Sequence, residues 1–339
     1  TTSKVERKVE TTNTEAYEFY LKAKHKYEKR ENKDDTEIAR GLLKKAIELD
    51  DNLIAAKVQL GWTYSEMGDY DEAMEIYTPA LKQSEEIGDK HMMGASLNNI
   101  GSVHYYKGDY DKALDYFGKS LTIQEELGDK RGMGMTLGNI GVVHYGKGDY
   151  DKAIDYYGRS LAIVEELGDK RGMGFSLNSI GNVHADKGNY DKAIDYYGRS
   201  LAIVEDIGDK RGMGYSLHNI GGVHKDKGDY EKALDYYNRS LKIFEELGDK
   251  RGMGFSLNNI GNVHNYKGDY KKAEECLEKS LAIQKEIGIK EIELETTTSL
   301  YLTYKHLGKD YDVKEIHSLI KETYNMEFEL NLRLYELLE

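Results

Sequence analysis

The sequence has few of the residues that build disulfide frameworks, thiolate metal clusters or proline-rich segments. Its 339 residues include one cysteine (Cys276), one proline (Pro79) and one tryptophan (Trp62). A single cysteine excludes an internal disulfide and a cluster of thiolate ligands, and it is typical of a reducing compartment. We therefore predict a cytoplasmic protein that needs no cofactor and no metal.

The sequence is also short of positive charge and of long apolar runs. Lys and Arg number 48 against 61 Asp and Glu, which gives a formal net charge of -13 at pH 7. Because phosphate binding requires clustered Lys and Arg, we predict no nucleic-acid partner. No apolar run reaches membrane-spanning length and no signal-peptide pattern opens the chain, so we predict no membrane insertion. The start at Thr1 and the apolar-rich end suggest a piece of a longer protein.

Glycine and tyrosine, in contrast, are abundant and recur at a fixed step. The stretch from Arg171 to Lys210 is repeated every forty residues, in copies that open at His91, Arg131, Arg171, Arg211 and Arg251. Each copy holds two helix-length segments separated by glycine turns. A period of this size predicts stacked helical hairpins, each of which buries its apolar face against its neighbours.

Apolar periodicity extends this array on both sides of the five copies. The flanking helices are expected at 14–30, 36–49, 53–67, 70–87, 290–307 and 311–323. We predict a flexible lead-in over 1–13, one solenoid of about eight hairpins over 14–323, and a capping or connecting helix within 324–339, at about 327–338. Pro79 lies deep in a helix and predicts a bend there.

Gly-Asp pairs such as Gly108-Asp109 and Gly128-Asp129 separate the helices. Glycine adopts the left-handed conformation that ends a helix, and aspartate accepts hydrogen bonds from the first free amides of the next helix. The pairs therefore predict the ends of the helices.

The unit that opens at Arg171 resembles the tetratricopeptide repeat. Its first helix carries Leu177, Ile180 and Gly181 at the large-Leu-Gly positions, and its second carries Ala193, Tyr197 and Ser200 at the small-aromatic-small positions. His184 stands where that family has tyrosine. The resemblance implies an all-α, right-handed superhelical solenoid of antiparallel helix hairpins.

Two finer resemblances concern function. The sequence pattern LxNIGNVHxxKGDYDKA is similar to that of the arrays of GoLoco-containing G-protein regulators and kinesin light chain, whose repeats hold extended peptides along the concave side. The opening, EAYEFYLKAKHKYEKR followed by GLLKKAIELD, resembles repeat segments attached to bacterial class III nucleotide cyclases and serine/threonine kinases.

Comparing the five copies with one another separates packing positions from variable ones. In the first helix, positions such as Leu177, Ile180 and His184 are identical in all copies. The positions that change are those of Phe175, Asn178, Ser179, Asn182, Ala185 and Asp186. At about 100° per residue the changing positions form one stripe roughly 120° wide. In the family the first helices line the concave surface, so the resemblance makes this stripe a groove.

Asparagine and aromatic residues dominate the stripe, and we predict that it binds a peptide. An asparagine amide matches the alternating donors and acceptors of an extended backbone, and aromatic rings hold apolar side chains. The alternative is a polar helix surface that simply faces water. The predicted peptide-binding residues are Asn98, Asn99, Tyr105, Asn139, Tyr145, Phe175, Asn178, Asn182, Tyr215, His218, Asn219, Phe255, Asn258, Asn259 and Asn262.

A second row consists of histidines at one position of every copy, namely His104, His144, His184, His224 and His264. Neighbouring hairpins separate them by about 8–10 Å, too far for a shared zinc site. We expect buried, hydrogen-bonded histidines, with acid sensitivity as the alternative. The many tyrosines are expected in the core, and the Asp-Lys-Arg corners, such as Asp169 to Arg171, are expected to be solvated charges and not anion sites.

An enzyme needs reactive side chains that differ from their surroundings, whereas nearly every candidate here is copied five times. We therefore predict a non-enzymatic scaffold for protein–protein interaction that binds an extended protein or peptide segment of unknown identity in its groove. Two alternatives stay open. The array is the regulatory or sensory region of a larger bacterial signalling enzyme, a nucleotide cyclase or kinase, or it is a scaffold that self-associates.

Overall fold

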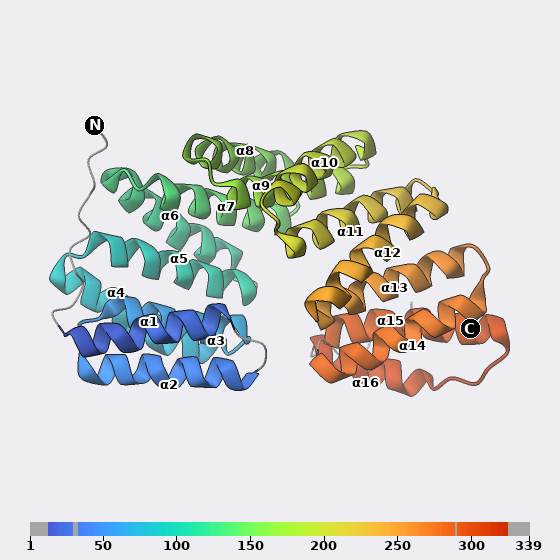
Figure 1. Cartoon of the computed structure of the whole chain (residues 1–339), viewed down its shortest axis with the longest axis horizontal. Coiled ribbons are helices and arrows are strands. Elements are labelled where there is room, and N and C mark those ends of the chain that lie inside the picture. Colours follow the sequence, from blue (N-terminus) through green and yellow to red (C-terminus); the bar gives the residue numbers. More distant parts are fainter. Residues whose placement is uncertain (1–12, 30–32, 289, 325–339) are drawn as a thin grey trace. The chain divides into compact units, whose positions relative to one another are not determined.

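The computed structural model describes residues 13–29, 33–288 and 290–324, in which every regular element is an α-helix (Figure 1). The helices in this part of the chain are α1 (Thr14–Glu28), α2 (Lys33–Leu49), α3 (Ile54–Glu66), α4 (Tyr70–Ile87), α5 (Lys90–Tyr106), α6 (Tyr110–Leu127), α7 (Lys130–Gly146), α8 (Tyr150–Leu167), α9 (Lys170–Asp186), α10 (Tyr190–Asp206), α11 (Lys210–Asp226), α12 (Tyr230–Leu247), α13 (Lys250–Tyr266), α14 (Tyr270–Ile287), α15 (Lys290–Leu307) and α16 (Val313–Tyr324).

Successive helices pack in pairs, which confirms the predicted all-α solenoid of helix hairpins. The chain divides into two compact units, Thr1–Gly168 with α1–α8 and Asp169–Glu339 with α9–α16. We call them the N-terminal and the C-terminal unit. Within each unit the second helix of one hairpin packs on the first helix of the next. The single solenoid over 14–323 stays a prediction.

Three expectations concern the ends of the chain and Pro79. Most of the predicted lead-in and the predicted helix at 327–338 lie outside the described residues. Asn13, the last residue of that lead-in, caps α1 by accepting a hydrogen bond from the Ala16 amide at 3.1 Å. Pro79 lies inside α4, which continues through it. The bend expected there stays a prediction.

The helix caps confirm one half of the Gly-Asp prediction and contradict the other. At the junctions between hairpins the aspartate caps the next helix, as Asp129 does by accepting a hydrogen bond from Gly132 N at 3.0 Å. Within the hairpins the prediction is wrong, because Asp109 makes no side-chain cap bond to α6. Its carboxylate is instead 3.3 Å from Nδ1 of His104. Gly108 adopts the left-handed φ of +79° that the turn requires.

The aspartates within the hairpins pair with the repeated histidines, and this explains the histidine position in several copies. His144 is buried, its Nδ1 lies 3.3 Å from Asp149 Oδ2, and its ring stacks on Tyr156 with a centroid distance of 5.3 Å. The same partners surround His104 and His224. The predicted structural role is thus confirmed at these positions.

His184 differs because asparagine replaces the aspartate at position 189. Its Nδ1 is buried and has no hydrogen-bond partner among the described residues. Desolvation accordingly lowers the pKa of the His184 imidazole. At the corner that precedes α9, Lys170 pairs with Asp206, which supports the predicted surface role of the corner charges.

The six hairpins from α3–α4 to α13–α14 are each closed by one large apolar side chain, aromatic in five of them, that lies directly on a glycine. In the copy that opens at Arg171, Tyr197 of α10 is 2% exposed, and a Cβ placed on Gly181 of α9 would be 2.5 Å from its ring. The equivalent contacts are Gly61 with Tyr77, Gly101 with Phe117, Gly141 with Tyr157, Gly221 with Tyr237 and Gly261 with Leu277. These glycines are required by the close approach of two helices.

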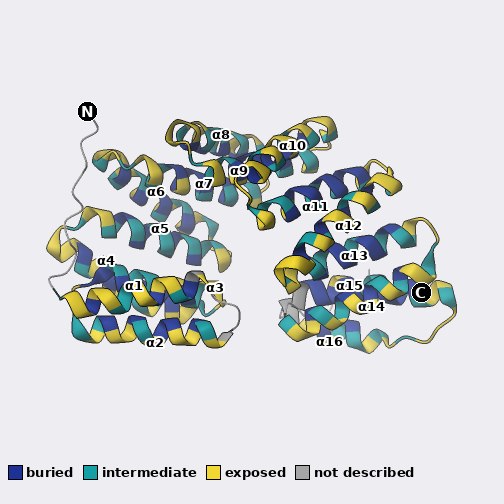
Figure 2. Ribbon diagram, in the orientation of Figure 1, coloured by how far each residue is buried: buried dark blue, intermediate teal, exposed yellow. Residues whose placement is uncertain are grey.

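The next hairpin then packs on the same aromatic. Ile220 and Val223 of α11 join Ala193 and Tyr197 in one buried cluster. In the N-terminal unit, Phe117 of α6 meets Ile140 and Val143 of α7 in the same way. Figure 2 shows buried positions, in dark blue, recurring along the helices of both units. The core is therefore a series of small clusters.

Gly181→Ala should destabilise the protein, because the added methyl group cannot fit beside Tyr197. We expect a loss of about 1–3 kcal/mol in the free energy of unfolding, as for other overpacked cores. The matched control is Gly198→Ala in α10, where a Cβ meets nothing within 4 Å. This control should be stabilised by up to about 1 kcal/mol through helix propensity. Urea unfolding followed by circular dichroism tests both, and equal stabilities for the two variants would contradict the packing argument.

Candidate peptide-binding surface

The predicted binding residues belong to the first helices of the hairpins, which contact one another from hairpin to hairpin within each unit. In the C-terminal unit, Nδ2 of Asn178 donates a hydrogen bond to Oγ of Ser216 at 3.0 Å. Asn182 accepts two hydrogen bonds through Oδ1, from the Tyr197 hydroxyl at 2.7 Å and from Nδ2 of Asn219 at 3.4 Å. These amides therefore join α9 to α11.

The same pattern continues from α11 to α13 and from α13 to α15. Nδ2 of Asn259 lies 3.2 Å from Nε2 of His218. Asn258 is 1% exposed and bonded at both ends, since Nδ2 donates to Glu295 at 3.0 Å and Oδ1 accepts from Thr296 at 3.0 Å. Asn258 consequently bridges two helices in the interior and is not accessible to a ligand.

In the N-terminal unit, Asn98 links α5 to α7. Its Oδ1 accepts hydrogen bonds from Oγ1 of Thr136 and from Nδ2 of Asn139, both at 3.1 Å. Sequence reasoning missed Thr136 and its counterparts Ser216 and Thr296. The signal was present, because every copy carries a serine or threonine at this position. We call this series of inter-helix bonds the asparagine ladder.

The aromatic residues of the stripe behave differently, because they remain accessible. Phe175 of α9 is 54% exposed and Tyr215 of α11 is 37% exposed, whereas Phe255 of α13 is half-buried. All three occupy one position of successive first helices. The Tyr215 ring meets Phe244 edge-on at 5.1 Å, and the Arg251 guanidinium lies 5.8 Å from the Phe255 centroid. We call Phe175, Tyr215 and Phe255 the aromatic column.

The remaining predicted residues fall into two groups. Tyr105 and Tyr145 lie at the ends of α5 and α7 and contact Tyr110 and Tyr150, with centroid distances of 5.7 and 6.0 Å. Burial raises the pKa of Tyr105. Asn99 and Asn262 are half-buried, and their amides have no hydrogen-bond partner among the described residues.

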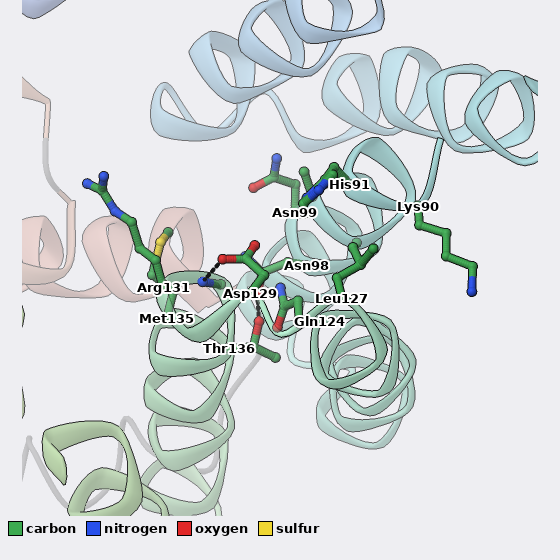
Figure 3. Close-up of a pocket in the computed structure, with 13 residues that line it drawn as sticks. Lys90, His91, Asn98, Asn99, Gln124, Leu127, Asp129, Arg131, Met135 and Thr136 are labelled. Atoms are coloured by element: carbon green, nitrogen blue, oxygen red, sulfur yellow. Dashed lines mark hydrogen bonds between the residues drawn. The ribbon is translucent and has the colours of Figure 1, made fainter. Parts of the chain in front are cut away.

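A cavity of about 290 Å³ opens beside Asn98 and Asn99 in the N-terminal unit (Figure 3). It is lined by Lys90, His91, Gly94, Ala95, Asn98, Asn99, Gln124, Leu127, Asp129, Arg131, Gly132, Met135 and Thr136. Gln124 of α6 is 6% exposed, and its Nε2 donates a hydrogen bond to Ser120 Oγ at 3.0 Å. Its Oε1 has no partner among the described residues. Sequence reasoning missed this residue because it compared the first helices alone.

Two searches of the described residues concern other kinds of site. None of the helices in this part of the chain combines the length and the apolar character that crossing a membrane requires. No group of three or more His, Cys, Asp or Glu side chains is arranged there to hold a metal ion.

Comparison with known proteins agrees with this architecture. The family model described as tetratricopeptide repeat matches residues 52–126, 132–206 and 212–286. The chain belongs to the tetratricopeptide repeat family. Such repeats form scaffolds suited to protein interaction. The comparison with curated proteins found no significant match.

Several solved structures share the fold of this tetratricopeptide repeat chain. The signal transduction ATPase with numerous domains and a tetratricopeptide repeat sensor from Pyrococcus horikoshii has a TM-score of 0.66 and 17% identity, covering 97% of this chain and 56% of that chain. The apo form of RapI has a TM-score of 0.63 and 17% identity, and the match covers 81% of this chain and 99% of that chain. BtubC from P. vanneervenii has a TM-score of 0.57 and 19% identity, and the match covers 65% of this chain and 92% of that chain. At these identities the similarity concerns the fold alone.

His218→Asn should make the protein less sensitive to acid. Burial, assisted by the positive charge of Lys225, lowers the pKa of His218 to about 4. The unfolded imidazole has a pKa near 6.5. The unfolded state therefore takes up a proton first, so the neutral histidine supports folding fully above about pH 6.5 and this support is lost as the pH falls to about 4.

The expected loss is on the order of 2–3 kcal/mol over this pH range. Asparagine is a compatible replacement, because Asn98, Asn178 and Asn258 occupy the same position in other copies. Urea unfolding of both proteins between pH 7 and pH 4 measures the difference. Parallel stability curves would contradict the assignment to His218.

Proposed function

We propose that this chain is a non-enzymatic scaffold that binds an extended segment of another protein across its first helices. The observation that carries this proposal is the aromatic column, which presents Phe175, Tyr215 and Phe255 from three successive helices. Exposed aromatic side chains in a row are typical anchors for a protein partner, because they bury a large area at a small cost in entropy.

The spacing of the column fits an extended ligand. Packed helices lie about 8–10 Å apart, so successive rings repeat at about that distance. A polyproline II segment has three residues per turn and rises about 3.1 Å per residue, which places every third side chain on one face about 9 Å apart. We therefore infer a partner segment with apolar residues at every third position.

The asparagine ladder has a supporting role in this proposal. Because Asn178 and Asn182 are bonded to the next helix, their first task is to fix neighbouring first helices in register. A surface held rigid before binding loses less entropy when the ligand arrives. The half-buried Asn262 keeps its amide available for a peptide backbone.

Three further hypotheses concern Cys276, the location of the protein and its wider role. Burial raises the pKa of the Cys276 thiol, which supports a structural rather than a reactive cysteine. A cytoplasmic location follows from that single cysteine and stays a prediction. The regulatory region of a signalling enzyme and the self-associating scaffold also stay predictions.

The double variant Phe175→Ser, Tyr215→Ser should lose peptide binding while remaining folded. Peptides are first selected from a randomised display library on the intact chain, and their affinities are then measured by fluorescence polarisation. Loss of two anchors should weaken binding about tenfold or more. The matched control is Leu247→Ser at the end of α12, where the side chain is 41% exposed but lies outside the first helices. Equal binding by the double variant would refute the column, and a library that yields no peptide would refute the proposed function.

A further inference from the structure

The cavity in the N-terminal unit has a filled counterpart in the C-terminal unit, because the two copies share a backbone pattern but differ in side chains. The copy that opens at 211 carries Arg211, Tyr215 and Phe244 where the copy that opens at 91 carries His91, Ala95 and Gln124. The filled copy therefore shows which chemical groups this place accepts.

In the filled copy the chain supplies its own arginine. Nε of Arg211 lies 3.0 Å from Oδ2 of Asp249; the arginine side chain is 67% exposed and the aspartate side chain 8% exposed. Phe244 is buried between Gly214 and Gly252, and Tyr215 packs against its ring. A guanidinium on a nearly buried carboxylate is a charge-assisted pair, the stronger kind of hydrogen bond.

In the copy that opens at 91, the same carboxylate lacks that arginine. Asp129 is the counterpart of Asp249, and it likewise caps its helix through Oδ1. No cationic side chain pairs with Asp129 among the described residues, and the shorter His91 stands at the position of Arg211. In the described part of the chain the arginine–aspartate pair forms in the copy that opens at 211 and not in the copies that open at Arg131 and Arg171. Ala95 and Gln124 occupy less volume than tyrosine and phenylalanine, and the cavity lies where those larger groups would be.

The wall of the cavity offers a carboxylate oxygen, because Asp129 caps α7 through Oδ1 and retains Oδ2. Oε1 of Gln124 has no hydrogen-bond partner in the described part of the chain, but it is buried beneath the cavity surface. Ala95, Leu127 and Met135 supply apolar surface beside the carboxylate. The wall thus suits a side chain with an apolar stem and several donors at its tip.

Two basic residues at the rim of the cavity, Lys90 and Arg131, do not pair with Asp129. Lys90 is paired with Glu126 at 2.7 Å. Arg131 is exposed, and Figure 3 shows its guanidinium pointing away from Asp129. The formal charge of the whole chain, -13, also favours a cationic partner.

We propose that this cavity binds an arginine side chain of a protein partner, with its guanidinium on Asp129 as Arg211 lies on Asp249. This inference rests on the proposed function and adds the chemistry of the partner to it. Arginine is favoured over lysine because its planar guanidinium presents several donors and sheds water more readily than an ammonium group. Its stem would lie along Ala95 and Leu127.

The test places the chain's own arginine in the cavity. His91→Arg supplies the residue that the filled copy tolerates at this position, so the protein should fold normally. His91→Ala is the matched control, which leaves the cavity open. Peptides selected from a randomised library on the wild-type chain should share one arginine, and each is also made with norleucine in its place.

We expect His91→Arg to lower the affinity for the arginine peptide by about tenfold to a hundredfold. The norleucine peptide should bind equally weakly to the wild type and to the variant. His91→Ala should bind like the wild type. Asp129→Asn should weaken the arginine peptide by a similar factor, because asparagine still caps α7 but carries no charge.

Each other outcome overturns the inference in a recognisable way. If His91→Arg binds the arginine peptide like the wild type, the cavity does not hold arginine, although the proposed function stands if the aromatic-column variant loses binding. Selected peptides with an acidic residue in place of arginine would assign an anion to the cavity. If Nα-acetylarginine amide alone binds as tightly as the peptide, the ligand is a free guanidinium compound. A library that yields no peptide refutes both proposals.

Discussion

The structure depends on one contact that recurs along the array, a large apolar side chain of the second helix on a glycine of the first, with an aromatic ring in four of the five copies and Leu277 in the copy that opens at 251. Tyr197 on Gly181 brings α9 and α10 so close that even a methyl group would not fit between them. The outer side of the same ring then receives Ile220 and Val223 from the next hairpin. One residue pair therefore sets both the spacing within a hairpin and the surface on which its neighbour packs. Since packing interactions are short-ranged, a chain can add copies of such a unit without redesigning its core.

The asparagine ladder shows how stacking uses the polar positions of the first helices. A first helix has to contact the first helices on both sides, and its polar positions are used for this purpose wherever a partner is within reach. Asn178 meets Ser216, and Asn258 meets Thr296. The position that stays accessible is the sixth residue of the first helix, where Phe175 and Tyr215 are exposed. Variation between copies therefore selects one stripe of the first helices but does not separate the residues that bond to neighbouring helices from the exposed ones.

The sequence was sufficient for the hairpins and for their order, because glycine turns and apolar spacing are local properties of the chain. It also predicted the packing role of Gly181 and Tyr197, since these positions do not vary in character. It was insufficient for the partners of polar side chains. Asp109 stands at the N-cap position and is a residue type that caps helices, but its carboxylate pairs with the His104 ring instead. Asn98 and Thr136 are 38 residues apart, and only the stacked structure shows that they meet. The cavity was missed for the same reason, since its walls come from α5, α6 and α7.

A repeat protein also contains its own comparison structures. In the copy that opens at 211, Phe244 lies between Gly214 and Gly252. The equivalent glycines of the copy that opens at 91 are Gly94 and Gly132, and the side chain between them is the smaller Gln124. A buried acceptor without a donor costs free energy, and so does a carboxylate deprived of its cation. Neither cost arises in the copy that opens at 211, where Arg211 and Phe244 complete the packing. The copy that opens at 91 thus keeps a cavity and a carboxylate without a cationic partner among the described residues, where the copy that opens at 211 holds a buried ring and an arginine–aspartate pair. The proposed arginine site depends on this difference between two copies of one fold.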